Sequence, residues 1–356
     1  MKNTKVSFSG QDLYIGIDVH KNNWSVTIIF MGIIIKTFSM NPDPKELMKY
    51  LQKNYPGGIY HTVYEAGFCG FWIDRILREA GINNIVVNPA DVPTSNKEKR
   101  RKTDRIDSKK LAKELSVNNL EAIYIPSEKS EAIRSLSRLR TQLVKDQTRL
   151  KNRIKSLLYF SGAKFPGNDE LKHWSAKFIK QLSEQEFVYK EKKITLDLLL
   201  ESLKQNREKL VKVVKELRVV VREDKKTNKI IGHLLTVPGV GFITAVTLYT
   251  EIMEIKRFVK LDKLIAYIGL APDTSSSGEH EDVLGITQRQ QGYLRSLLIE
   301  AAWIAIRKDP ALTACYGKLN QRMSSQRAII RIAKKLVSRI MYVWNNQQDY
   351  VFSVVS

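Results

Sequence analysis

The stretch Leu13-Tyr14-Ile15-Gly16-Ile17-Asp18 is a short apolar run that ends on an acid. An alternating run at Trp24–Phe30 follows it, and another apolar run, Ile33–Phe38, comes directly after Gly32. Strand-like runs separated by turns at Gly or Asn are typical of a meander of strands. These residues therefore predict that the chain begins with three neighbouring strands, the first of which ends at Asp18.

The segment after these strands alternates between helical and strand-like patterns. The spacing of apolar residues predicts helices over Pro44–Asn54 and Phe71–Ala80. Short apolar runs predict strands over Tyr60–Glu65 and Asn84–Val87. The resulting order, three strands followed by helix, strand, helix and strand, indicates a mixed sheet covered by helices. We place this α/β domain at residues 1–125.

The part of the chain between residues 127 and 225 is poor in glycine and carries leucines at every seventh position. Such a repeat marks the seam of a long helix. We expect a coiled-coil segment over residues 126–228, folded as an antiparallel hairpin or paired with a second copy of the chain; an ordinary helical bundle is the alternative. A mostly helical domain at residues 229–356 follows. The two leucine series are Leu136, Leu143, Leu150 and Leu157, then Leu196, Leu203, Leu210 and Leu217.

The charge balance of the chain is strongly basic. Its 356 residues contain 59 Lys and Arg against 37 Asp and Glu, which gives a formal net charge of +22. Such an excess repels itself unless a polyanion neutralises it, and nucleic acid is the usual polyanion. The alternative is a soluble basic protein without such a partner. We therefore expect the protein to bind nucleic acid.

The N-terminal residues and the cysteines bear on the compartment. Met1–Asp12 lacks the apolar stretch of a signal peptide, and the apolar run Ile28–Ile35 is far shorter than the ~20 residues that span a bilayer. The two cysteines, Cys69 and Cys315, lie far apart in the sequence, which excludes a disulfide scaffold and a cysteine-based zinc site. We expect a cytoplasmic protein with no membrane partner.

Basic side chains and one glycine-containing turn suit contact with nucleic-acid phosphates. The first long helix carries eight basic residues between positions 134 and 155 against one acid, Asp146. The turn Pro238-Gly239-Val240-Gly241 precedes a helix and exposes backbone amides. A solvated helix face and a purely structural turn are the alternatives. The candidate contacts are Lys99, Arg100, Arg101, Lys102, Arg138, Arg149, Arg153, Gly239, Gly241, Arg331 and Lys335.

Four acids stand out by their positions. Asp18 and Glu65 end predicted strands, and Asp104 and Asp107 are spaced to lie on one face of a helix that follows a basic run. Converging carboxylates repel each other unless a divalent ion neutralises them, and hard oxygen ligands select Mg²⁺ or Mn²⁺. Two such ions can activate an attacking oxygen and stabilise a leaving oxygen in phosphoryl transfer. The alternatives are helix N-terminal acids and an ordinary strand-end charge.

Several motifs together resemble one protein family, the insertion-sequence-110 transposases, which are the DEDD transposases now called bridge-RNA-guided recombinases. Each motif is short, but their order and separation cover nearly the whole chain. Four motifs resemble the N-terminal domain of that family, and two resemble its C-terminal domain. They are Tyr14–Lys21, Tyr64–Gly67, Asn88–Ala90 and Lys102–Asp107, followed by Val237–Gly241 and Tyr267–Pro272 with the stretch up to Ser277-Gly278.

The resemblance implies a fold and a set of site residues. It implies a ribonuclease-H/RuvC-like N-terminal domain, a coiled-coil segment used in assembly, and a C-terminal domain with a nucleophilic serine. That serine is Ser277, five residues after Pro272, although Ser276 beside it could take the role. The stretch Asp273–Gly278 has no apolar side chain and is predicted to be an exposed loop. The implied metal-binding tetrad consists of Asp18, Glu65, Asp104 and Asp107.

The resemblance also implies an activity and partners. The protein would cut and rejoin donor and target DNA through a covalent serine–DNA intermediate, in the cytoplasm of a prokaryote. A structured guide RNA would choose the sites by base pairing, and a dimer or tetramer would form because the tetrad of one subunit meets the serine of another. Three alternatives remain: a Holliday-junction nuclease in which the tetrad uses water, a non-catalytic DNA-binding protein, and an actin-like ATPase whose first strand also ends in Gly-x-Asp.

Overall fold

The computed structural model describes residues 8–93, 104–163, 174–277, 280–286 and 291–352, without the side chains of residues 104–105 and 273–286. The chain divides into two compact units, Met1–Ile125 and Pro126–Ser356. Each unit has its own hydrophobic core. Each unit is therefore described by itself.

Unit 1 is built on a five-stranded sheet with the strand order β3-β2-β1-β4-β5. Strand β1 pairs antiparallel with β2 and parallel with β4, so the sheet is mixed as the sequence predicts. This arrangement is consistent with the RuvC-like domain that the resemblance implies. The elements are β1 (Asp12–Val19), β2 (Trp24–Phe30), β3 (Ile33–Met40), α1 (Pro44–Asn54), β4 (Ile59–Glu65), α2 (Trp72–Glu79), β5 (Asn83–Val87) and α4 (Asp104–Ser116).

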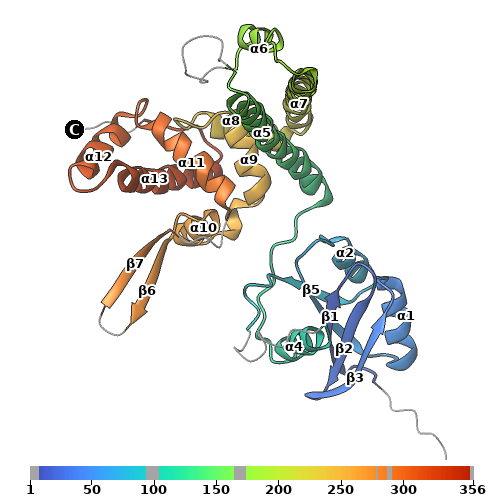
Figure 1. Ribbon diagram of the computed structural model, residues 1–356. Coiled ribbons are helices and arrows are strands. Elements are labelled where there is room, and N and C mark those ends of the chain that lie inside the picture. The colour runs from blue at the N-terminus through green and yellow to red at the C-terminus, as the bar shows by residue number, and fades with distance from the viewer. Residues whose placement is uncertain (1–7, 94–103, 164–173, 278–279, 287–290, 353–356) are drawn as a thin grey trace, which may run out of the picture. The chain divides into compact units, whose positions relative to one another are not determined.

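The two faces of this sheet are covered by different helices (Figure 1). Because side chains alternate along a strand, Leu13, Ile15 and Ile17 of β1 point to one face, where they pack with residues of α1 and α2 in a single core cluster. Helix α4 packs on the opposite face, where Leu111 joins Val63 of β4 in a second cluster. Residues of even number on β1 therefore face α4.

Unit 2 is mostly helical. Its large core joins parts of the long helices to the C-terminal helices, and a second cluster joins α6 to the ends of α5 and α7. The elements are α5 (Glu128–Phe160), α6 (Ala176–Ser183), α7 (Lys190–Glu223), α8 (Lys225–Leu235), α9 (Phe242–Ile252), the short helix Ile255–Arg257, α10 (Leu261–Ile268), β6 (Pro272–Ser277), β7 (His280–Ile286), α11 (Gly292–Ala305), α12 (Pro310–Asn320) and α13 (Ser325–Asn346).

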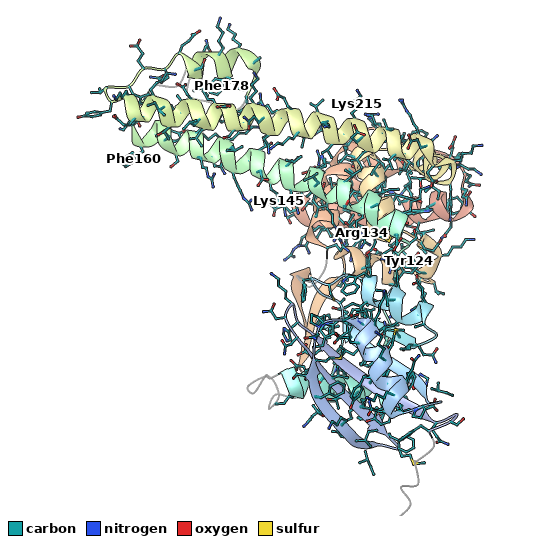
Figure 2. All side chains as sticks on the ribbon, turned by 90° about the vertical axis from the view of Figure 1, so that its right-hand side faces the viewer. Tyr124, Arg134, Lys145, Phe160, Phe178 and Lys215 are labelled. Atoms are coloured by element: carbon teal, nitrogen blue, oxygen red, sulfur yellow. The ribbon has the colours of Figure 1, made fainter. Side chains whose placement is uncertain are left out.

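Helices α5 and α7 lie side by side as an antiparallel pair (Figure 2). Ile154 near the end of α5 packs in one cluster with Leu196 near the start of α7, whereas Leu143 shares a cluster with Leu217. The antiparallel hairpin that the leucine series predicts is thus present. Coiled-coil geometry and a role in assembly stay predictions. Of the predicted seam, Leu143, Leu196, Leu203 and Leu217 are buried, and Leu136, Leu150, Leu157 and Leu210 are partly buried.

The prediction of a loop over Asp273–Gly278 is wrong for its described part. Residues Pro272–Ser277 form strand β6, which pairs antiparallel with β7 and places Ser277 opposite His280. The hydropathy pattern missed this strand because a two-stranded hairpin satisfies its backbone hydrogen bonds by pairing alone. An alternating apolar face is needed only where a strand also covers a core.

Within the described ranges, no helix has both the length and the apolar character that crossing a membrane requires.

Candidate active site and nucleic-acid interface

Two of the predicted site acids lie at the ends of neighbouring parallel strands. Strand β1 pairs with β4 so that Gly16 lies beside Val63 and Ile17 beside Tyr64, which places Asp18 and Glu65 at the next position of the pairing. Val63 contacts the cluster that includes α4, and Glu65 is two residues further along the same strand. Asp18 and Glu65 therefore lie on the face of the sheet that α4 covers, and both are half-buried.

Helix α4 approaches β1 closely because residue 16 is a glycine. A Cβ atom at Gly16 would lie 2.2 Å from the carbonyl oxygen of Ser108 and 2.4 Å from the backbone nitrogen of Ala112. Such distances are shorter than any van der Waals contact, so a side chain at this position would push the helix away from the strand. Gly16 thus sets the distance between the helix and the strand that ends at Asp18.

A buried hydroxyl cluster fixes the position of α4 along the sheet. The Ser108 hydroxyl lies 2.9 Å from Thr27 Oγ1 and 3.2 Å from Ser25 Oγ on strand β2, and all three side chains are buried. Polar groups of this kind are stable inside a protein only when they are hydrogen-bonded to one another. Ser25 pairs across the sheet with Asp18, so Ser108 lies level with the end of β1.

The anchored helix carries the other two predicted acids. Asp107 directly precedes Ser108, and Asp104, the first residue of α4, lies one turn before it. The backbone positions of all four acids therefore gather at one edge of unit 1, from two strands and one helix. The side chain of Asp104 lies outside the description, and among the described side chains no three of His, Cys, Asp or Glu form a metal-binding group. The metal tetrad stays a prediction.

A histidine next to the first strand contacts this edge. His20 Nε2 lies 3.1 Å from Asp18 Oδ2, and the backbone of His20 closes the turn to β2 by donating to the carbonyl oxygen of Asn23 at 3.2 Å. His20 belongs to the motif Tyr14–Lys21 but is not among the predicted site residues. Its position two residues after Asp18 is the feature of the sequence that points to this contact.

The motif Asn88-Pro89-Ala90 shapes the same edge of the sheet. It follows β5, whose Val87 lies beside Glu65 of β4. The Asn88 side chain accepts from the backbone nitrogen of Ala90 at 3.3 Å and donates to Asp91 at 2.9 Å. These bonds make a tight turn that carries the chain away from the strand ends.

Two of the basic residues on α5, Arg134 and Arg138, interact with helix α9. Arg138 donates to both carboxylate oxygens of Glu251 on α9, at 2.7 and 2.8 Å, and Arg134 donates to the backbone oxygen of Thr250 at 3.0 Å. The Glu251 side chain is only 5% exposed. These interactions stabilise the packing of α5 on α9. The Arg138 side chain is still 55% exposed, so its contact with nucleic acid stays a prediction.

The other predicted basic contacts on α5 and α13 are exposed. Arg149 pairs at 2.8 Å with Asp146 on the same exposed face of α5, and Arg153 is exposed one turn further on. On α13, Arg331 and Lys335 are also exposed. The other predicted basic contacts, Lys99, Arg100, Arg101 and Lys102, lie outside the described residues. A contact with nucleic acid stays a prediction for all of them.

The glycine-containing turn before α9 has a packing role. Gly239 has a φ of +84°, and a Cβ atom there would lie 2.1 Å from the carbonyl oxygen of Ala301 on α11. This favours the structural alternative for Gly239. Gly241 differs, because it is exposed at the N-terminus of α9 and no side chain caps that helix end. The backbone amides at this helix N-terminus are therefore better placed to bind an anion than Gly239 is.

Comparison with known proteins points in one direction. A family model described as "Transposase", of the IS110 DEDD type, matches residues 15–161, and one described as "Transposase IS116/IS110/IS902 family" matches residues 232–317. A transposase-named protein of Sinorhizobium fredii, y4qE, is 30% identical over 67% of this chain and 57% of its own length. The transposase for insertion sequence element IS1111A of Coxiella burnetii is 28% identical over 81% of this chain and 79% of its own.

Proposed function

Because the chain belongs to the IS110 family of transposases, we propose that it cuts and rejoins the DNA strands of a mobile insertion element. One observation carries the proposal. The first family model covers Asp18, Glu65, Asp104 and Asp107, and the fold gathers the backbone positions of these acids at one edge of unit 1. The second model covers Ser277 on β6. The two reactive groups of such an enzyme thus lie in separate units of the chain.

The four acids would hold Mg²⁺ or Mn²⁺. Their donor set fits a hard divalent cation, because every ligand is a carboxylate oxygen. When bound, the ion supplies charge to activate an oxygen nucleophile or to stabilise a leaving oxygen. The protein would contribute the positions of these carboxylates: strand pairing positions Asp18 and Glu65, and Gly16 and the Ser108 hydroxyl position the helix that carries Asp104 and Asp107.

The hydroxyl of Ser277 would act as the nucleophile in strand cleavage. The bond that forms joins its Oγ to phosphorus, and the bond that breaks joins phosphorus to the 3′-oxygen of the DNA, which takes up the proton that the hydroxyl loses. The energy of the phosphodiester is kept in the serine–DNA bond. Attack of another 3′-hydroxyl on that bond then rejoins the strands and frees the serine.

Assembly and guidance are also part of the proposal. We infer a homo-oligomer, a dimer or a tetramer, that positions Ser277 of one subunit against the acids of another, and a structured guide RNA that selects donor and target DNA. The net charge of +22 supports a nucleic-acid partner. Phe160 and Val188, at the same end of the α5–α7 hairpin, are 86% and 93% exposed, which supports a protein contact there.

A covalent-adduct assay tests the function. The protein is incubated with end-labelled DNA of the insertion-element ends, Mg²⁺ and the RNA that co-purifies with it, then denatured in detergent. We expect a labelled protein–DNA band that Ser277→Ala removes and Ser276→Ala retains. Loss of the band with Ser276→Ala instead would move the nucleophile by one residue. Cleavage without any adduct would favour a hydrolytic Holliday-junction nuclease.

A further inference from the structure

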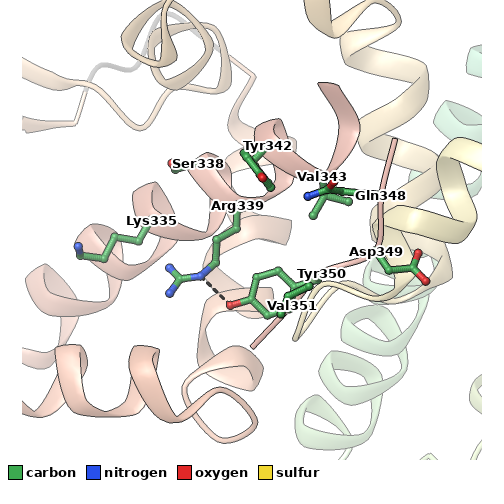
Figure 3. Close-up of a pocket in the computed structure, with 9 residues that line it drawn as sticks. All are labelled: Lys335, Ser338, Arg339, Tyr342, Val343, Gln348, Asp349, Tyr350 and Val351. Carbon is green, nitrogen blue, oxygen red and sulfur yellow. Dashed lines mark hydrogen bonds between the residues drawn. The ribbon is translucent and has the colours of Figure 1, made fainter. Parts of the chain in front are cut away.

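A cavity of about 510 Å³ lies where the C-terminal segment folds back along α13. Its lining includes Lys335, Arg339 and Tyr342 from α13 and Gln348 and Tyr350 from the segment that follows (Figure 3). This volume lies within the range of ligand sites, ~300–1,000 Å³. None of the proposed metal-binding acids lines it, nor does Ser277, but Lys335 is one of the predicted phosphate contacts.

The floor of this cavity is held by a buried polar network. Arg339 Nε donates to the Tyr350 hydroxyl at 2.9 Å, and that hydroxyl donates to Asp309, whose side chain is fully buried. The backbone nitrogen of Tyr350 donates to Thr236 Oγ1 at 2.8 Å. These bonds fix the Tyr350 ring, and Figure 3 shows the two terminal nitrogens of Arg339 directed away from it. The site is therefore built in advance of any ligand.

The exposed face of α13 leads into the cavity as a basic stripe. Arg327, Arg331 and Lys335 follow one another at intervals of four residues, and Tyr342 lies two turns beyond Lys335 on the same face. All four are exposed, with the Tyr342 ring at 60%. Helix α13 contains no acidic residue along its entire length. A polyanion can thus follow this face without meeting a negative charge on the helix itself.

Both acids at the cavity have hydrogen-bond partners within the protein. Asp349, in the lining, accepts from His233 Nδ1 at 2.7 Å, and Asp309, beneath the floor, accepts from Tyr350 and lies 3.8 Å from Arg339. The other charged side chains of the lining, Lys335 and Arg339, are cations, and Tyr342 and Tyr350 supply aromatic rings. Cationic grooves that end on exposed aromatic rings bind single-stranded nucleic acid, because phosphates follow the cations and unpaired bases stack on the rings.

The geometry points to a single-stranded DNA site on α13, in which phosphates lie along Arg331 and Lys335 and one unpaired base stacks on Tyr342 at the mouth of the cavity. A duplex keeps its bases stacked on each other, so it can use the stripe but not the ring. The choice of DNA rests on the proposed function, since strand exchange produces unpaired DNA.

Binding measurements on the full chain test this site. The probes are a fluorescein-labelled 20-nucleotide single strand of mixed DNA sequence, the duplex of the same sequence and the matched RNA, each titrated by fluorescence anisotropy without Mg²⁺. We expect Tyr342→Ala to weaken binding of the DNA single strand about five- to hundred-fold, the value of one stacked base. Tyr342→Phe keeps the ring and should stay within about twofold of the unaltered protein.

Two control variants distinguish stacking on the Tyr342 ring from the loss of any exposed tyrosine and from the loss of positive charge. Tyr189→Ala removes a tyrosine of similar exposure, 65%, at the start of α7, and should leave affinity unchanged. Lys335→Gln should weaken binding of single strand and duplex alike, because it removes one phosphate contact from both. Circular dichroism of each variant verifies the fold.

Three results would overturn the inference. They are an unchanged single-strand affinity for Tyr342→Ala, an equal loss for the duplex, or a loss confined to the RNA probe. The assay needs neither cleavage nor Ser277, so its failure leaves the proposed function standing. A protein that binds none of the probes would contradict both.

Discussion

In each of the two units of this chain, a glycine allows two backbone segments to approach each other closely. In unit 1, Gly16 lets α4 approach strand β1, and in unit 2, Gly239 lets the turn before α9 approach α11; a Cβ atom would come within about 2 Å of backbone oxygen in both. The first contact brings the N-terminal part of α4 close to the ends of the strands, where the predicted metal-binding acids lie. The second closes a helical core whose outer faces carry cations. The predicted acids of unit 1 thus belong to one edge, whereas the cations of unit 2 are distributed along helices.

The difference shows what each kind of site requires. A metal site made of Asp18, Glu65 and Asp107 would depend on how the chain folds, because these acids come from three separate elements, β1, β4 and α4. A basic stripe needs only helical periodicity, so single residues in it are replaceable. We therefore expect substitutions in unit 1 to act on chemistry and substitutions in unit 2 to act on affinity.

The largest effect is expected for Asp104→Asn. Loss of one carboxylate from the proposed metal site should lower strand cleavage on the order of a thousandfold or more, because several kcal/mol of transition-state stabilisation depend on the ion. Binding of DNA should stay within about twofold. Cleavage is followed on labelled DNA with Mg²⁺, and binding by anisotropy. Unchanged cleavage would remove Asp104 from the site.

Substitution of Gly16 or Gly239 should destabilise only the unit that contains the altered residue. Gly16→Ala and Gly239→Ala each force a backbone contact apart, at an expected cost of about 3 kcal/mol, and Gly239→Ala adds strain because its φ is +84°. Native-state hydrogen exchange should show faster opening in the mutated unit alone. Equal loosening of both units would contradict two separate cores. Gly241→Ala is the matched control, since no atom lies within 4 Å of its Cβ position.

The arginines of α5 should divide into two classes. Arg138→Gln leaves the buried Glu251 with Arg134 alone and should destabilise the protein by on the order of 2 kcal/mol. Arg153→Gln should leave stability unchanged and lower the slope of log affinity against log salt by about 1, because one phosphate contact is lost. Urea unfolding and salt titrations measure the two effects. A lower slope for Arg138→Gln would return it to the phosphate track.

The smallest effect concerns the junction between α7 and α8. The hydrogen bond from Lys129, together with that from the Thr227 backbone, lowers the pKa of Asp224 from 3.8 to about 2. A lowered carboxyl pKa contributes stability that is complete above about pH 4 and is lost as the pH falls towards 2. Asp224→Asn keeps an oxygen for the helix cap but does not titrate, so the stability of this variant should depend less on pH between about 4 and 2. Asp224→Ala should also lose about 1 kcal/mol at pH 7. Urea midpoints at pH 3 and pH 7 test both.

Much of unit 1 could be predicted from the sequence, because strands and helices there follow simple patterns. The run 13–18 lies within β1, which ends at Val19, one residue after Asp18; Glu65 ends β4, and the two strands pair in parallel. The hydroxyl cluster of Ser25, Thr27 and Ser108 could not be predicted, since Ser108 lies 83 and 81 residues from the other two and all three look like ordinary polar residues. The same holds for the contact of His20 with Asp18.

Unit 2 shows the opposite balance. Its helices and its basic content were evident from heptads and charge, but the fate of each cation was not. Arg138 and Arg153 look alike in the sequence and are both exposed, yet only Arg138 of the two forms an ion pair with Glu251, 113 residues away. Strand β6 was missed because pairing with β7, and no apolar pattern, makes it a strand.

The secondary structure of most segments, the basic character of the chain and the presence of acids suited to a metal site can be predicted from local periodicity and composition. The three-dimensional fold sets which strand ends share one edge, which arginines pair with a buried acid and where an exposed tyrosine meets a cavity. Those outcomes depend on contacts between distant segments, which the order of residues along the chain does not display.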